Sequence, residues 1–201
     1  MAINHEIIFA GRSNVGKSSL IKRLTGRSVR TGRRPGVTRK PTHITFRDLL
    51  ITDLPGYGFL HGVPDVVQER IKNSIVHYIE DNCGRILCAV QVVDASVFCE
   101  IVDRWSERGE IPVDIELFEF LSDLDIDTVI AANKMDLITD RDHALDQIVE
   151  RFDFLPPWRQ WIDTVAPVSA KKGDVSQLSA LVRSRLHRIG RDNLFGQFRT
   201  V

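Results

Sequence analysis

The residues from Gly11 to Ser18, GRSNVGKS, have types and spacing that suit phosphate binding. They match the whole pattern G-x-x-x-x-G-K-[ST]. Gly11 and Gly16 let the backbone bend so that successive N–H groups converge on phosphate oxygens. Lys17 adds a cation for the β- and γ-phosphates, and Ser18 offers a hydroxyl to Mg²⁺. The stretch predicts a loop that holds a nucleoside triphosphate through Gly11, Arg12, Ser13, Asn14, Val15, Gly16, Lys17, Ser18 and Ser19.

A second group of residues has the chemistry of a metal site beside the γ-phosphate. Asp53 in DLPG follows an apolar run, so its carboxylate can bind the metal, usually through water, and Gly56 can bring its backbone N–H to the γ-phosphate. Thr38 lies in the loop RPGVTRK and can become a metal ligand when the γ-phosphate holds that loop closed. The predicted metal ligands are Ser18, Thr38 and Asp53, with Gly36 and Val37 contacting the nucleotide beside Thr38.

Two further motifs can read a purine base. Asp136 in NKMD can accept hydrogen bonds from the guanine ring N–H and exocyclic amine. Adenine offers a different edge there, and a mismatched partner would leave polar groups unpaired. In the motif SAK, the backbone N–H of Ala170 can meet guanine O6. The base-contacting residues are predicted to be Asn133, Lys134, Asp136, Ser169, Ala170 and Lys171, with Lys134 along the base and Asn133 bracing the loop.

Strands and helices must position these motifs. Runs rich in Val and Ile alternate with amphipathic segments, a pattern typical of an α/β fold with a mostly parallel sheet. The expected strands are Glu6–Ala10, Ile44–Phe46, Leu49–Thr52, Ile86–Val93, Thr128–Ala132 and Thr164–Val168. The expected helices are Lys17–Thr25, Pro64–Glu80, Pro112–Leu124, Arg141–Phe152 and Val175–Arg188. The charged stretch Glu100–Glu110 is interpreted as an insertion that forms either a partner surface or a solvated loop.

The chain of 201 residues has room for one sizeable core. We expect a single domain over residues 1–190 and a basic tail over 191–201, where the helical pattern is lost and the tail frays or docks loosely. The start of the chain lacks a signal-peptide pattern, and no apolar run approaches the length of a membrane span. These features favour a cytoplasmic protein with no membrane partner.

Formal net charge is zero, but basic residues are unevenly distributed. No acidic residue lies between Glu6 and Asp48, where eleven cationic side chains occur: Arg12, Lys17, Lys22, Arg23, Arg27, Arg30, Arg33, Arg34, Arg39, Lys40 and Arg47. The end of the chain is also basic, with Arg183, Arg185, Arg188, Arg191 and Arg199. This asymmetry fits either a polyanion partner on one face or a basic surface exposed to solvent.

Taken together, the segments GRSNVGKSSLI, RPGVTRKP, DLPGYGF, NKMD and SAKKG resemble the EngB (YihA-type) group of Era-like and Ras-like P-loop GTPases. The resemblance covers roughly Glu6 to Arg188. It implies a three-layer fold with a six-stranded, mostly parallel sheet, one antiparallel edge strand and helices on both faces. It also implies GTP and GDP binding, slow Mg²⁺-dependent hydrolysis, and assistance in assembling the large ribosomal subunit through contacts with ribosomal RNA or protein.

Two departures qualify this resemblance. Many bacterial members have Thr where this chain has Asn133, and their loops differ from GVTRKP, so the chain is similar to an archaeal-type member. Ras itself uses a glutamine after the DxxG glycine, whereas Tyr57 stands here and cannot orient water as a carboxamide does. In this respect the chain resembles GTPases with a hydrophobic or aromatic residue at that position. We therefore expect slow turnover that depends on Lys17, Thr38 and Asn14.

Asn14 occupies the position that binds potassium in several related GTPases, and its alternative role is to brace the loop. Arg33 or Arg34 acting in cis is a rival source of positive charge. Tyr57 and Phe59 are expected to be exposed as a partner-docking pair, with burial as the alternative.

Three functional classes follow from these observations. A nucleotide-switched GTPase that acts as a monomer fits the motifs best. A GTP-dependent scaffold with negligible hydrolysis remains open because of Tyr57. A P-loop kinase or ATPase is disfavoured by the NKMD motif.

Overall fold

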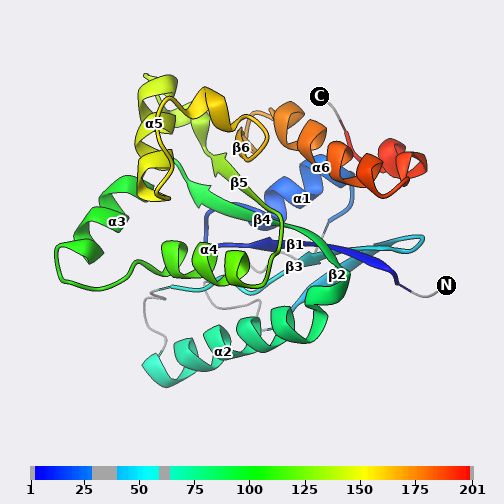
Figure 1. Cartoon of the computed structure of the whole chain (residues 1–201), viewed down its shortest axis with the longest axis horizontal. Coiled ribbons are helices and arrows are strands. Elements are labelled where there is room, and N and C mark those ends of the chain that lie inside the picture. The colour runs from blue at the N-terminus through cyan, green and yellow to red at the C-terminus, as the bar shows by residue number, and fades with distance from the viewer. Residues whose placement is uncertain (1–2, 29–39, 59–63, 200–201) are drawn as a thin grey trace.

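The computed structural model describes residues 3–28, 40–58 and 64–199, apart from the side chain of Asp65. It has one six-stranded sheet in the order β2-β3-β1-β4-β5-β6 (Figure 1). The strands are β1 (His5–Ala10), β2 (Thr42–Phe46), β3 (Leu49–Asp53), β4 (Ile86–Asp94), β5 (Thr128–Asn133) and β6 (Val165–Pro167). Neighbouring strands are parallel except for β2, which pairs antiparallel with β3 at one edge of the sheet. The predicted fold class is therefore confirmed.

Helices cover both faces of the sheet (Figure 1). They are α1 (Lys17–Thr25), α2 (Asp65–Asn82), α3 (Phe98–Ser106), α4 (Val113–Asp123), α5 (Arg141–Arg151) and α6 (Ser176–Arg188). The apolar side chains of α1 and α6 pack on one face, and those of α2 and α4 pack on the other face, over β1 and β4. A third cluster joins α3 and α5 to β5 and β6. Among the helices in the described ranges, none has both the length and the apolarity to cross a membrane.

Helix α3 was not predicted, so the interpretation of Glu100–Glu110 as a loop is wrong for its first half. Phe98 and Val102 are buried against the third cluster, and Trp105 is half-buried one turn later. Their spacing of four and three residues marks one face of a helix. Charged residues on the other face, including the Glu100–Arg104 ion pair, obscured that pattern.

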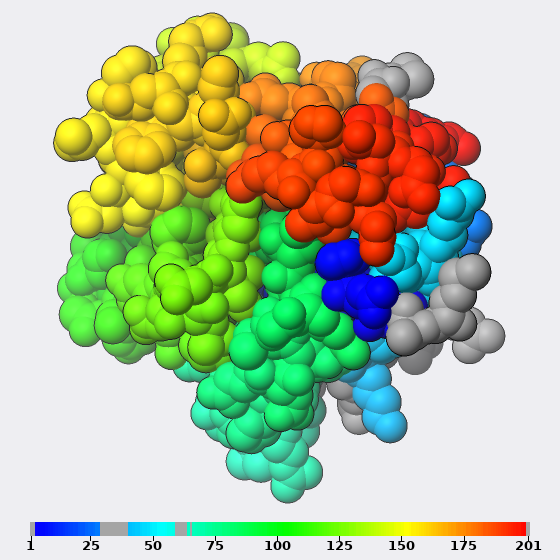
Figure 2. All heavy atoms as spheres, turned by 45° about the vertical axis from the view of Figure 1, so that its right-hand side comes forward, coloured from blue at the N-terminus to red at the C-terminus, as the bar shows by residue number. Residues whose placement is uncertain are grey.

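The segment after α6 is also better ordered than expected. Residues Asp192–Gln197 form a short 3₁₀ helix, and Leu194 and Phe198 are buried in the same core as α1 and α6. Arg191 forms an ion pair with Asp48 in the β2–β3 turn, with 2.8 Å between Nη2 and Oδ2. Figure 2 shows this C-terminal segment, in red, lying against the blue N-terminal residues and the cyan β2–β3 region. The prediction of a loosely docked tail is wrong for residues up to Arg199.

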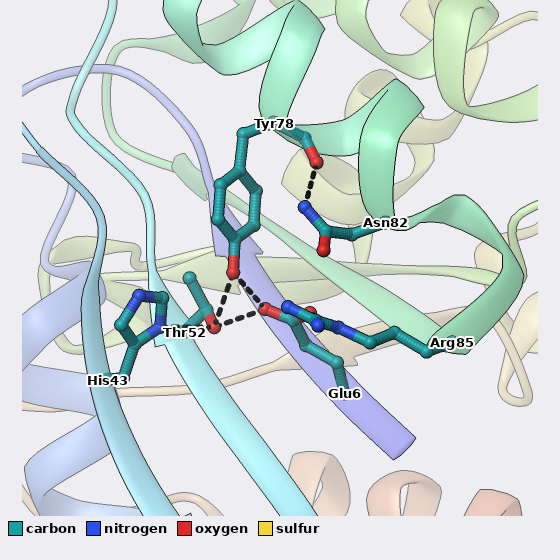
Figure 3. Close-up of polar contacts among 6 residues, drawn as sticks. All are labelled: Glu6, His43, Thr52, Tyr78, Asn82 and Arg85. Carbon is teal, nitrogen blue, oxygen red and sulfur yellow. Dashed lines mark hydrogen bonds and ion pairs between the residues drawn. The ribbon is translucent and has the colours of Figure 1, made fainter. Parts of the chain in front are cut away.

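A buried carboxylate ties α2 to the sheet. The side chain of Glu6 in β1 is fully buried and accepts hydrogen bonds from the hydroxyls of Tyr78, at 2.5 Å, and Thr52 (Figure 3). Arg85 forms an ion pair with its other oxygen at 2.8 Å. His43 on β2 extends the network, with 3.0 Å between its Nδ1 and Thr52 Oγ1. Because both carboxylate oxygens have partners, the charge of Glu6 is compensated and holds β1, β3 and α2 together.

Replacing Glu6 with glutamine should lower the free energy of unfolding by about 3 kcal/mol, since it leaves Arg85 without its counter-charge. Arg85 remains partly hydrated, which keeps the loss at the low end for a broken buried pair. The melting temperature should fall by about 6–12 °C. The matched control is Glu80→Gln, which removes an exposed carboxylate of α2 beside His77 and should leave thermal unfolding unchanged. Equal melting curves for both variants would show that the Glu6 cluster contributes nothing to stability.

Candidate functional site

The predicted phosphate-binding loop connects β1 to α1. Gly16 precedes the first helical residue with φ 101°, a left-handed conformation that favours glycine, and a Cβ there would collide with Asn133 Nδ2. Asn14 also has positive φ, at 67°. Adjacent backbone conformations of opposite hand turn successive N–H groups toward one point, where the start of α1 adds the positive end of its dipole. The loop has the backbone geometry of an anion site.

Lys17 bends its side chain back over this loop. Its ammonium donates to the carbonyl oxygens of Gly11, at 2.7 Å, and Arg12, at 2.9 Å. The side chain is buried, and burial lowers the pKa of Lys17 to about 8, while the carboxylates of Asp53 and Asp114 oppose that shift. A desolvated ammonium beside converging N–H groups interacts more strongly with phosphate than a hydrated one.

Ser18 and Asp53 lie together where α1 begins and β3 ends. The Ser18 hydroxyl donates to Asp53 Oδ2, and Oδ1 is buried with no hydrogen-bond partner in the described part of the chain. Burial raises the pKa of Asp53, against the effects of Ser18 and Lys17. An unpartnered carboxylate oxygen beside a hydroxyl is a donor set that fits Mg²⁺, which prefers hard oxygen ligands. The predicted residues Gly36, Val37 and Thr38 lie outside the described residues.

The DLPG segment packs directly on the phosphate-binding loop. A Cβ at Gly56 would lie 2.6 Å from Ser13 Oγ and 2.8 Å from Ser13 Cα, so a larger residue does not fit. The Ser13 N–H donates to the Tyr57 carbonyl at 3.1 Å. The Tyr57 side chain turns inward, is buried, and donates its hydroxyl to Asp114 Oδ1 at 3.2 Å. The expectation of an exposed Tyr57 is therefore wrong, and Phe59 lies outside the described residues.

Asn133 connects the phosphate loop to the predicted base loops. Its Nδ2 donates to the Val15 carbonyl at 2.7 Å, and its Oδ1 accepts from the Ala170 N–H at 3.0 Å. The sequence predicts that this N–H meets guanine O6, whereas in the structure it donates to Asn133. The Ser169 hydroxyl donates to Asp136 Oδ1 at 2.6 Å and lowers the pKa of this carboxyl, which stays ionised. One amide thus fixes the separation of two loops, and one hydroxyl orients the predicted base-reading carboxylate.

Lys134 has left-handed backbone geometry with φ 69°. Its ammonium pairs with Asp94 at the end of β4, which leaves the aliphatic part of the side chain along the cavity wall. Arg23 of α1 donates from Nε to the Ala170 carbonyl at 2.9 Å and so ties α1 to the SAK loop. Both cations are used to support loops of the site.

These residues surround a cavity of about 690 Å³ at the carboxyl ends of the parallel strands, within the size range of small-molecule sites. Its walls include predicted residues from the phosphate and base motifs: Asn14, Gly16, Ser19, Asn133, Lys134, Asp136, Ala170 and Lys171. Sequence reasoning missed Lys22, Arg23, Gly26, Leu137 and Arg199 as wall residues. Lys22 and Arg23 could have been found, because they lie about one helical turn beyond Ser19, which was predicted to contact the nucleotide. Arg199 carries no local signal, since only folding brings it over Gly26.

The predicted polyanion surface loses much of its C-terminal part. Arg183 donates to the carbonyls of Phe195 and Phe198. Arg185 is buried and pairs with Asp127, with 3.0 Å between Nη2 and Oδ1. Arg188 pairs with the same Asp127, and Arg191 pairs with Asp48 as described above. In the N-terminal set, Lys17, Arg23 and Arg27 also bond carbonyls of the chain. The exposed cations Lys22, Lys40 and Arg47 are therefore the stronger candidates for such a surface.

Comparisons with known proteins agree with this geometry. Residues 6–134 match the family model described as 50S ribosome-binding GTPase. The chain is 55% identical over 195 residues to a probable GTP-binding protein EngB of Methanosarcina mazei, covering 96% of this chain and 93% of the relative. A protein of the same name from Pyrococcus abyssi is 52% identical over 168 residues, covering 84% of this chain and 79% of the relative. The crystal structure of a probable GTP-binding protein engB superposes with a TM-score of 0.83 at 48% identity, covering 91% of this chain and 99% of that one.

Replacing Asn133 with alanine should weaken GDP and GTP-analogue binding alike by roughly 30-fold, since two hydrogen bonds worth about 1 kcal/mol each are lost. Titration calorimetry measures both affinities. The control is Asn82→Ala, which removes an amide that bonds the Tyr78 carbonyl within α2, and should leave both affinities unchanged. Unchanged nucleotide affinity in a folded Asn133→Ala protein would contradict the bracing role.

Proposed function

The chain belongs to the EngB family of GTP-binding proteins and is a GTPase, and from this premise we propose how its cavity binds and hydrolyses GTP. The observation that carries the proposal is the Asn133 bridge, which holds a phosphate-binding end and a base-reading end at a fixed separation within one cavity. The triphosphate would lie along the loop Gly11–Ser19, with the Lys17 ammonium against the β- and γ-phosphates.

Magnesium would be held by Ser18 and Asp53, with Thr38 as a further ligand when GTP is bound. The unpartnered Asp53 oxygen beside the Ser18 hydroxyl supports this assignment. When bound, the ion would neutralise charge on the phosphate oxygens. The chain's own contribution is to bring the start of α1 and the end of β3 together.

Guanine would be read by Asp136, with Lys134 along the base and Ala170 and Lys171 beside its O6 edge. The ionised, Ser169-oriented carboxylate supports this role, because it can accept two hydrogen bonds from guanine that adenine cannot donate. This preference argues against a P-loop kinase or ATPase.

Hydrolysis would depend on positioning and charge, with little help from the residue after Gly56. The hydroxyl of Tyr57 is bonded to Asp114, so this side chain does not orient a water at the γ-phosphate. Lys17 supplies one positive charge. Asn14, which lines the cavity with positive φ, would contribute a ligand for a potassium ion between the β- and γ-phosphates. Slow turnover follows, and negligible turnover would leave the protein a GTP-dependent scaffold.

Its partner would be a precursor of the large ribosomal subunit in the cytoplasm, bound by a monomer. The family description supports this proposal, and so does the stretch from residue 7 to 47 that contains no acidic residue. Exposed cations in this region, such as Lys22, Lys40 and Arg47, would contact RNA phosphates.

With magnesium present, the protein should release phosphate from GTP over several turnovers and should release none from ATP. Release from GTP should be faster in potassium buffer than in sodium buffer.

The Asp136→Asn variant should change the preference toward xanthosine triphosphate by roughly 10²–10⁴-fold in kcat/KM, because the hydrogen-bond pattern at the base edge is reversed. Asp140→Asn, which alters the exposed cap of α5, is the control. For the wild-type protein, GTP binding without phosphate release would favour the scaffold alternative, and ATP hydrolysis would favour a P-loop kinase or ATPase. Equal hydrolysis rates in potassium and sodium buffers would refute the proposed potassium site at Asn14.

Large-subunit precursors should co-sediment with the protein more strongly in the presence of a non-hydrolysable GTP analogue than with GDP. Binding should weaken steeply between about 50 and 200 mM salt if phosphates supply most of the contacts. Lys40→Glu should reduce co-sedimentation, whereas Arg183→Gln should affect it little because that guanidinium bonds internal carbonyls. Binding that is independent of the nucleotide would refute this partner.

A further inference from the structure

We propose that Asp114 is a positioning residue for GTP hydrolysis, which holds Arg12 and Tyr57 so that the Gly56 backbone stays fixed against the phosphate-binding loop. The inference deepens the proposed function and rests on it. Asp114 belongs to α4, outside all of the nucleotide-binding motifs, and nothing in its local sequence marks it as part of the site.

The contacts of Asp114 join three parts of the molecule. Its side chain is 1% exposed, and Oδ1 accepts the Tyr57 hydroxyl at 3.2 Å. Oδ2 faces Arg12 Nη1 at 3.7 Å, within ion-pair range and beyond a hydrogen bond. The Asp114 carbonyl accepts from Gln91 Nε2 at 2.6 Å, which anchors this turn of α4 to β4. The carboxylate therefore stands on a fixed support between the phosphate loop and the DLPGY segment.

Arg12 and Tyr57 are also paired through their backbones. The two residues form a parallel β-bridge, and the next N–H of the loop, that of Ser13, donates to the Tyr57 carbonyl. The Arg12 guanidinium lies over Gly58, where an added Cβ would be 3.1 Å from Arg12 Cζ. Both side chains then converge on Asp114. The segment that carries Gly56 is thus held by its backbone and by a shared carboxylate.

Stability alone does not explain a charge at this position. Burial raises the pKa of Asp114 to about 6, with Arg12, Tyr57 and Lys17 opposing the shift, so ionisation is costly here. The nearest atoms of Arg12 and Asp114 both lack a hydrogen-bond partner among the described residues. A neutral side chain of similar size would avoid the desolvation cost. The negative charge of Asp114 has an explanation if it positions the Arg12 guanidinium.

The Arg12 side chain borders an open space. A cavity of about 110 Å³ lies between the phosphate loop, α3 and α4, lined in part by Arg12, Asp114 and Phe98. No side chain among the described residues fills this space, so we ascribe the place of the guanidinium to the attraction of Asp114 and to its contact with Gly58. Asp94 and Lys134 also face the cavity, but they pair with each other.

The consequence differs between GTP and GDP. In the proposed binding mode Gly56 lies at the γ-phosphate end of the loop, so its position matters only for a nucleotide that has a γ-phosphate. Loosening this segment should reduce turnover and GTP-analogue affinity and should spare GDP. An effect of this kind separates positioning from general destabilisation, which would weaken both nucleotides.

The test compares the Asp114→Asn and wild-type proteins by titration calorimetry and single-turnover hydrolysis. We expect kcat to fall roughly tenfold or more, GTP-analogue affinity to fall about tenfold, and GDP affinity to stay within about twofold. Asp127→Asn is the matched control, because it removes the acidic partner of Arg185 away from the cavity and should change none of these values. Tyr57→Phe, which removes only the hydroxyl, should lower turnover in the same direction. In the double variant the total loss should be smaller than the sum of the two single losses, because both substitutions break the same contact. Tyr57→Phe also keeps the test open if Asp114→Asn does not fold.

The pH dependence supplies a second readout. The Asp114 carboxyl is ionised above about pH 6, so wild-type turnover should fall as pH drops through that value. Arg12, Lys17 and Tyr57 face this carboxyl, together with Glu116 nearby. Burial lowers the pKa of Lys17 only to about 8 and raises the pKa of Tyr57, so neither of these two groups changes its charge near pH 6. In Asp114→Asn the fall near pH 6 should be absent.

Equal losses for GDP and the GTP analogue, or an identical pH profile in the variant, would show that Asp114 is merely structural. Failure of wild-type turnover would refute the proposed hydrolysis. In that case the ratio of GTP-analogue to GDP affinity in Asp114→Asn still decides the role of Asp114.

Discussion

The amide of Asn133 makes the contact on which the rest of the site depends. A nucleotide has fixed dimensions, so the loop that binds its phosphates and the loops that read its base must be held at one separation. Two hydrogen bonds from one buried side chain set that separation, to Val15 on one side and Ala170 on the other. The parallel sheet makes this possible, because β1, β3, β5 and β6 all end at the same edge and deliver their motifs there.

Two buried carboxylates on the α2 and α4 face of the sheet show how differently a fold can treat the same chemical group. Both oxygens of Glu6 have partners, and this network stabilises the fold. Asp114 has one hydrogen bond and one distant cation, and it faces a cavity. Fully satisfied polar networks rigidify a core, whereas incompletely satisfied ones carry a free-energy cost. Glu6 holds a helix to the sheet, whereas Asp114 contacts Tyr57 and Arg12 at the candidate site.

The sequence predicted the sheet and five of the six helices, because Val- and Ile-rich runs and helical periodicity are local signals. Helix α3 was missed because its two buried residues, Phe98 and Val102, stand among charges. Burial of Tyr57 was only the alternative expectation, and its partner Asp114 could not be identified because it is remote in sequence. Arg199 likewise reaches the cavity only through the packing of Leu194 and Phe198. Motif residues are predictable because phosphate chemistry restricts them, whereas partners chosen by tertiary packing are not.

The Glu6 network also limits how α2 can move. Tyr78 and Arg85 hold the C-terminal end of this helix to β1, and the Lys72–Glu116 ion pair ties its middle to α4. Ile71 and Ile75 are buried near these two attachments, whereas Val66 in the first turn is exposed. A change at the start of α2 would therefore be absorbed within its first turn, and the rest of the helix would stay with the sheet.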